Sequence, residues 1–117
     1  MFDSFKQWLE ARRQLNRNHA LVAQLLKHGV SLSQPRTIDC HFWLRTELQA
    51  KALAQKLQAR GFEILRTNAA SGESGLWNLE ASISQSPNHT AKVSFIREMV
   101  RLAQECGGTY DGWGTQV

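Results

Sequence analysis

Two stretches of alternating apolar and polar residues limit the folds open to this chain more than any other feature. Residues 37–44 and 76–84 place apolar side chains at every second position, a period typical of a strand with one buried face. The predicted buried residues are Ile38, Cys40, Phe42, Leu44, Trp77, Leu79, Ala81 and Ile83. The predicted outward residues are Thr37, Asp39, His41, Trp43, Asn78, Glu80, Ser82 and Ser84. The pattern therefore predicts a sheet with one polar face.

A helix is predicted between these two strands. Thr46 and Gln49 have the spacing of a capping box, and Gly61 marks the end of the helix. Its predicted apolar stripe is Ala50, Leu53, Ala54 and Leu57. Residues 62–67 then predict a second strand, and residues 68–75, rich in Ala, Ser and Gly, predict the loop of a hairpin.

A further helix and strand are predicted at the end of the chain. Ser86-Pro87 is a helix start, with a capping serine followed by proline at the first helical position. Apolar residues at helical spacing follow: Val93, Ile96, Val100 and Ala103. The helix is predicted to end at Gly107-Gly108, and residues 109–113 predict a short last strand.

The first segment, residues 3–28, carries apolar side chains near helical spacing and is followed by Gly29. Asn16, Arg17 and Asn18 interrupt it, because asparagine is a poor helix former and Asn18 is a suitable N-cap. The segment is therefore either one helix or two helices that meet at Asn18.

The order helix, then β-α-β-β-α-β, predicts an α+β fold. We expect a ferredoxin-like sandwich, a four-stranded antiparallel sheet with an extra N-terminal helix. Right-handed crossovers would place both connecting helices on one face of the sheet. The polar face is then left for the N-terminal helix, a protein partner or a second copy of the chain to cover.

Length and cysteine content set further bounds. A chain of 117 residues supports one hydrophobic core. No apolar stretch is long enough to cross a bilayer, and the N-terminus lacks the apolar segment of a secretory signal. Cys40 and Cys106 lie far apart without C-x-x-C spacing. We therefore expect a cytoplasmic protein with reduced thiols, no membrane association, no metal and no cofactor.

The polar sheet face holds the main candidates for chemistry. Asp39, His41 and Glu80 are predicted to share it, and an imidazole between two carboxylates suits acid–base catalysis. The sequence shows no accompanying nucleophile or phosphate-binding loop, and Cys40 belongs to the apolar face. We therefore predict that the protein is not an enzyme and that Asp39, His41, Trp43 and Glu80 contact a partner. A ligand-binding or enzymatic use of the face is the alternative.

Positive charge is concentrated near the N-terminus. The formal net charge is +4, and the first 30 residues hold five basic and two acidic side chains. A basic helix attracts acidic proteins or RNA, so Arg12, Arg13 and Arg17 are further candidate partner-binding residues. A small RNA-associated module is an alternative function. Trp43 alone offers little stacking surface for RNA on the sheet.

The closing residues carry a resemblance to a known family. Residues 110–115 read Tyr-Asp-Gly-Trp-Gly-Thr, and a Leu-Leu-x-x-Gly pattern ends at Gly29. Together with the strand that contains His41, they resemble the family of the regulator of ribonuclease E activity B (RraB). The resemblance covers residues 18–115 and is complete in the closing motif, which consists of Tyr110, Asp111, Gly112, Trp113, Gly114 and Thr115.

This resemblance implies a ferredoxin-like domain at residues 18–117, preceded by a helical extension at residues 1–17. It also implies an inhibitor that binds the scaffold region of a ribonuclease E-type enzyme and modulates mRNA decay, with RNA contacted indirectly or weakly. The better-known members are acidic, whereas this chain is basic. Within the motif, Asp111-Gly112 is a turn pair and Trp113 a large anchor. We expect the motif to lock the last strand onto the sheet, with a contact role as the alternative.

Overall fold

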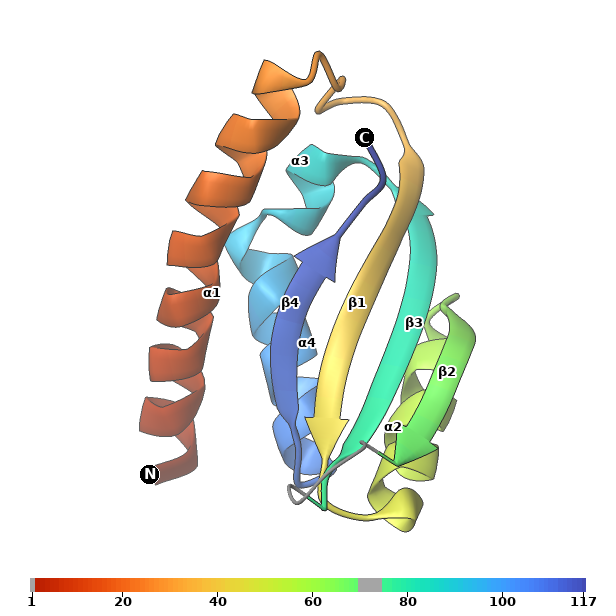
Figure 1. The fold of residues 1–117 in the computed structure, drawn as a ribbon. Coiled ribbons are helices and arrows are strands. Elements are labelled where there is room, and N and C mark those ends of the chain that lie inside the picture. Colours follow the sequence, from red (N-terminus) through yellow and green to blue (C-terminus); the bar gives the residue numbers. More distant parts are fainter. Residues whose placement is uncertain (1, 70–74) are drawn as a thin grey trace.

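The fold of the computed structural model is a four-stranded antiparallel sheet packed with helices (Figure 1). The structure describes residues 2–69 and 75–117. The strands are β1 (Arg36–Leu44), β2 (Glu63–Ala69), β3 (Trp77–Gln85) and β4 (Thr109–Gly114). The helices are α1 (Phe2–Lys27), α2 (Glu47–Ala59), α3 (Pro87–Thr90) and α4 (Val93–Glu105). The sheet order is β2-β3-β1-β4. The expected mixture of helices with an antiparallel sheet is confirmed.

The hairpin between β2 and β3 differs from the prediction at its first residues. Asn68 and Ala69 belong to β2 and pair with Asn78 and Trp77 of β3. The rest of the predicted loop, residues 70–74, lies outside the described residues.

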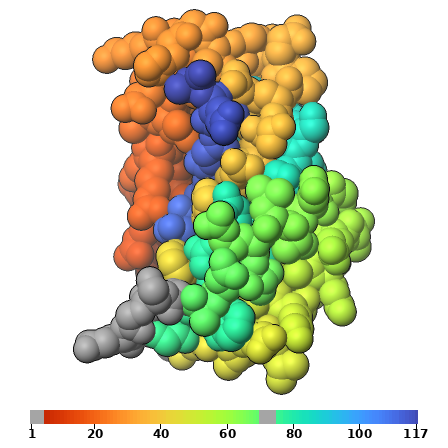
Figure 2. Space-filling view, turned by 45° about the vertical axis from the view of Figure 1, so that its right-hand side comes forward, coloured from red at the N-terminus to blue at the C-terminus, as the bar shows by residue number. Residues whose placement is uncertain are grey.

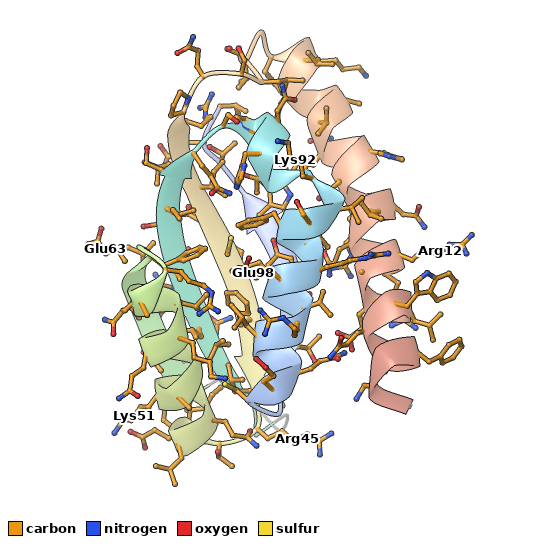
Figure 3. The ribbon with its side chains drawn as sticks, turned by 180° about the vertical axis from the view of Figure 1, so that it is seen from behind. Arg12, Arg45, Lys51, Glu63, Lys92 and Glu98 are labelled. Carbon is orange, nitrogen blue, oxygen red and sulfur yellow. The ribbon has the colours of Figure 1, made fainter. Side chains whose placement is uncertain are left out.

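The alternating residues of β1 and β3 form the centre of the core, as predicted. The inward residues of β1 are completely buried, and so are Leu79 and Ala81 of β3. Trp77 and Ile83, nearer the ends of β3, are only partly buried, and Ser82, which was predicted to be an outward residue, is buried at 7% exposure. Both α2 and α4 cover this apolar face, as Figure 3 shows from behind.

The capping box of α2 forms as the sequence predicts. The Thr46 hydroxyl accepts a hydrogen bond of 3.1 Å from the backbone N–H of Gln49, and the Gln49 side chain accepts one of 3.0 Å from the backbone N–H of Arg45. Three residues of the predicted stripe, Ala50, Leu53 and Leu57, are completely buried.

The helix predicted to begin at Pro87 is divided in two, which corrects the prediction of one continuous helix. The short α3 ends at Thr90, whose hydroxyl donates to the Ser86 carbonyl at 2.9 Å. The chain then turns at Lys92, the N-cap of α4, which has extended backbone angles. Val93 is the first residue of α4 and is 43% exposed, whereas Ile96, Val100 and Ala103 of the same predicted stripe are buried.

The first segment is one uninterrupted helix. Asn18 does not cap a second helix, because its side chain bonds elsewhere in the fold. Its amide donates to the Ala91 carbonyl at 3.3 Å, and its oxygen accepts a 2.7 Å hydrogen bond from the indole of Trp113. The two-helix alternative is therefore excluded.

Helix α1 runs beside β4 and against α4 rather than across the polar sheet face (Figure 1). Ala11, Gln14, Asn18 and Leu25 are its buried residues among those whose burial the structure describes. The N-terminal helix therefore does not cover the polar face, which we call the open face.

Candidate partner-binding surface

The open face gathers the outward residues of β1 and β3. The register places Asp39 opposite Ser82, His41 opposite Glu80, and Trp43 opposite Asn78. Asp39, His41, Trp43 and Glu80 are each partly exposed. Figure 2 shows side chains of β1, β3 and β4 at the surface between α1 and β2. The structure thus brings these four predicted residues together on one surface.

His41 and Glu80 face each other, and the carboxylate of Glu80 contacts an arginine. The Glu80 carboxylate lies 3.8 Å from the guanidinium of Arg66, its cross-strand neighbour on β2. Glu80 keeps only 19% of its side chain exposed, whereas Arg66 keeps 60%. Among the described residues, no hydrogen bond joins His41 to Asp39 or Glu80. The face is therefore a mixed-charge surface, with Arg66 as a member that the sequence did not indicate.

A hollow adjoins the open face at the end of β1. Its volume is about 530 Å³, and Trp43 forms part of its wall together with Arg45 and Thr109. Lys6 of α1 and Gln104 of α4 complete the side toward the helices. The Gln104 side-chain amide is buried and has no hydrogen-bond partner within residues 2–69 and 75–117. The hollow offers an aromatic wall, two cations and an unused donor.

Sequence reasoning missed Lys6, Arg45 and Gln104. Lys6 belongs to α1, Gln104 to α4 and Arg45 to the connection between β1 and α2, and no spacing in the sequence relates them. The only local sign was Gly107-Gly108, interpreted as a helix stop. A Cβ at Gly108 would lie 2.4 Å from the carbonyl oxygen of Trp43, so this glycine permits the close approach that shapes the hollow.

The closing motif attaches β4 to β1. Tyr110 is 1% exposed, with its ring centroid 5.3 Å from that of Phe42. Its hydroxyl lies 4.0 Å from the sulfur of Cys40. The Thr115 hydroxyl donates to the Thr37 carbonyl at 2.7 Å. These contacts fix β4 against β1 at the edge of the sheet.

Helix α1 also packs against the closing motif. A β-bulge at Asp111 interrupts the pairing of β4 with β1, and Gly112 follows it with φ of 106°. The Gln14 amide donates to the Tyr110 carbonyl at 3.0 Å, and the Arg17 guanidinium lies 3.3 Å from the Asp111 carboxylate. Helix α1 therefore covers the outer edge of β4, which would otherwise expose unpaired backbone groups.

The three predicted arginines do not form one cluster with the open face. Arg17 contacts Asp111 on β4. The guanidinium of Arg12 lies 5.4 Å from the ring centroid of Trp8, and Figure 3 shows Arg12 pointing away from the rest of the molecule. Arg13 is exposed on the same helix. The predicted partner-binding set therefore divides into an open-face group and an α1 group.

The cysteines are buried thiols. Cys40 is completely buried, as predicted, and burial raises its pKa to about 12, with the hydrogen bond from Tyr110 opposing the rise. A neutral thiol is a poor nucleophile and metal ligand. Within the described residues, no three His, Cys, Asp or Glu side chains are grouped to hold a metal ion. No helix in the same residues is long and apolar enough to span a membrane.

A protein-family model described as Regulator of ribonuclease activity B matches residues 15–115. The matched range contains the open face, Arg17 and the closing motif, and it excludes Arg12, Arg13 and the first turns of α1. No significant match was found among curated proteins.

Proposed function

The chain belongs to the family of the Regulator of ribonuclease activity B, and from this premise we propose that it is a regulatory protein-binding domain that inhibits a ribonuclease E-type enzyme. In this role the domain has no catalytic activity of its own and modulates mRNA decay in the cytoplasm. The observation that carries the proposal is the family match over nearly the whole chain.

The proposed contact surface is the open face, with Asp39, His41, Trp43 and Glu80 as contact residues. Two features support this choice. First, helices α2 and α4 lie on the opposite face and α1 lies at the β4 edge, so this surface is accessible (Figures 1 and 2). Second, Trp43 is a partly exposed aromatic beside a hollow, and such residues often dominate the binding energy of interfaces.

We also infer a ferredoxin-like arrangement for residues 36–114. In the order β2-β3-β1-β4, the connection through α2 passes over β3 and the connection through α4 passes over β1. Two interleaved β-α-β units of this kind support the inference. We also propose that the chain is divided into an N-terminal extension at residues 1–17 and a domain at residues 18–117. A family match that begins at residue 15 supports it, although Ala11 and Gln14 of the extension pack onto the domain.

The proposal is tested by adding the purified chain to a purified ribonuclease E-type enzyme that cleaves a short fluorogenic RNA. We expect the cleavage rate to fall, and we expect Trp43→Ala to weaken inhibition about tenfold or more. Leu48→Ala is the matched control, because Leu48 is 80% exposed on α2 and away from the open face. This variant should inhibit as well as the original chain.

Two results would count against the proposal. Absence of both inhibition and complex formation would contradict the regulatory role. Inhibition that arises from binding of the RNA substrate would favour an RNA-associated module, and such binding should weaken steeply as salt is raised. A gel-shift measurement with the RNA alone separates this case from inhibition through the enzyme.

A further inference from the structure

A cluster of exposed aromatic and aliphatic side chains lies on the first turns of α1. Phe5 is 61% exposed, Trp8 45% and Leu9 38%. With Arg12 they occupy positions i, i+3, i+4 and i+7, which share one side of a helix. We call these four residues the aromatic stripe. Large apolar side chains gathered at the surface are a common mark of an interaction site.

The side chains of the aromatic stripe contact one another. The ring centroids of Phe5 and Trp8 lie 6.1 Å apart in a stacked arrangement, and the Arg12 guanidinium is 5.4 Å from the centroid of Trp8. Their rotamers are therefore restricted before any partner arrives. This lowers the entropy that binding would otherwise cost.

The helix that carries the stripe is held firmly from its other side. Ala11 is 3% exposed against the core, and Gln14 and Asn18 hydrogen-bond to the last strand at 3.0 and 2.7 Å. The stripe is thus a preformed helical surface. This arrangement corresponds to the recognition mode in which helices meet through residues at i, i+3, i+4 and i+7.

The surroundings of the stripe are basic. Lys6 and Arg13 flank it on α1, and neither forms a salt bridge within the described residues. Beside Trp8, a hollow of about 370 Å³ between α1 and α4 is lined by Arg97, Glu98 and Arg101. Glu98 pairs with Arg60 and Arg101 pairs with Glu105, so Arg97 is the cation of this hollow that forms no salt bridge within the described residues. Complementarity therefore calls for an acidic partner. The two other possible occupants fit less well. A second copy of the chain would bring two helices of like net charge together. An anionic membrane would contact only about two turns of apolar surface.

We propose that the aromatic stripe docks an acidic amphipathic helix of a partner protein, with Phe5, Trp8 and Leu9 packing on its apolar side and the flanking cations pairing with its carboxylates. The stripe precedes residue 15, where the family match begins. It is also separate from the open face, so the site does not depend on a ribonuclease being the partner of that face.

The test uses the full chain and a synthetic helical peptide of about 20 residues, long enough to form a helix in water. The peptide carries leucines at helical spacing flanked by glutamates, and a matched peptide carries lysines in place of the glutamates. Binding is measured by fluorescence anisotropy of the labelled peptides. We expect saturable binding of the glutamate peptide and at least tenfold weaker binding of the lysine peptide.

Variants of the chain locate the site. Phe5→Ala with Trp8→Ala should weaken binding of the glutamate peptide about tenfold or more. Arg12→Ala with Arg13→Ala should weaken it less and reduce its dependence on salt. Leu26→Ala is the control, because Leu26 is 58% exposed on the same helix but outside the stripe. Thermal unfolding checks that every variant is folded.

Three outcomes would overturn the proposal. The first is equal binding of the two peptides, or equal binding by the Phe5→Ala, Trp8→Ala variant and the original chain. The second is preferential binding to phosphatidylserine-containing vesicles that is lost with Trp8→Ala, which would assign the stripe to a membrane surface. The third is a doubled mass in light scattering that the same double variant returns to the monomer value, which would assign it to a second copy.

Discussion

The side chain of Asn18 joins α1 to β4 and to the end of α3: its oxygen accepts a 2.7 Å hydrogen bond from the indole of Trp113, and its amide donates to the Ala91 carbonyl at 3.3 Å. Asn18 is 3% exposed and Trp113 is 8% exposed. The tryptophan of the closing motif therefore has a structural partner in α1. A residue with poor helix propensity is accommodated in the middle of α1 because its side chain satisfies a buried indole N–H and a partly buried carbonyl.

We predict that Asn18→Ala lowers the free energy of unfolding by about 2–3 kcal/mol, because it leaves the Trp113 N–H and the Ala91 carbonyl without partners. Urea denaturation measures the change. Asn16→Ala is the matched control, since Asn16 is exposed on the same helix. Its effect should stay within about 0.5 kcal/mol. Similar losses for both variants would show that the hydrogen bonds of Asn18 do not stabilise the fold.

We predict that Gly108→Ala destabilises the protein by about 2–3 kcal/mol. A Cβ at this position would lie 2.1 Å from Cδ1 of Leu44 and 2.4 Å from the Trp43 carbonyl oxygen, so β1 or the α4–β4 connection must shift. At Gly114 a Cβ would meet nothing within 4 Å. Gly114→Ala should therefore leave the thermal midpoint nearly unchanged, and a comparable drop in both variants would contradict the steric argument.

The sequence predicted most of the residues of the two faces of β1 and β3, because a period of two assigns each residue to a side without any knowledge of its partners. Ser82 is the exception, since it was predicted to be outward and is buried at 7% exposure. Asp39, His41, Trp43 and Glu80 could be placed on one surface for this reason. The helices were less predictable. The turn at Lys92 divides the predicted helix into α3 and α4, and Val93, the first residue of α4, stays exposed. No local residue pattern indicates that the Ala91 carbonyl bonds to Asn18.

Contacts between residues distant in sequence were the least predictable part of the candidate site. Gln14 reaches the Tyr110 carbonyl and Arg17 reaches Asp111, across more than 90 positions in each case. The path of α1 beside β4 depends on these contacts. From the sequence alone, Arg12 and Arg17 looked equivalent, whereas one stacks on Trp8 and the other contacts the closing motif.

The buried thiol of Cys40 predicts a loss of stability at alkaline pH. Burial raises its pKa in the folded chain to about 12, above the ordinary value of 9.0, and burial also raises the pKa of Tyr110. The stabilisation is complete below about pH 9, where both states keep the thiol proton. Between about pH 9 and 12 the unfolded chain loses that proton and the folded chain keeps it, so stability falls by about 1.4 kcal/mol per pH unit from Cys40 alone.

Urea denaturation at about pH 8 and pH 10.5 measures this loss in the original chain and in Cys40→Ala. The variant is expected to start less stable because it leaves a small cavity, but its stability should fall less between the two pH values. Burial, the largest cause of the raised pKa of Tyr110, is common to both proteins, whereas the smaller effects of Cys40 on Tyr110 are lost in the variant and belong to the measured difference. Identical losses would show that Cys40 ionises equally in the folded and unfolded chains.

The ion pair of Arg17 with Asp111 should contribute little to folding. The two side chains are 63% and 45% exposed at a separation of 3.3 Å, and exposed pairs of this kind stabilise proteins by about 1 kcal/mol or less. We predict that a double-mutant cycle with Arg17→Ala and Asp111→Ala gives a coupling energy of about 0.5 kcal/mol that shrinks in about 1 M salt. If Arg17→Ala weakens binding to the ribonuclease much more than this coupling, Arg17 contacts the partner directly. A coupling above about 2 kcal/mol would instead make the pair a main attachment of α1 to β4.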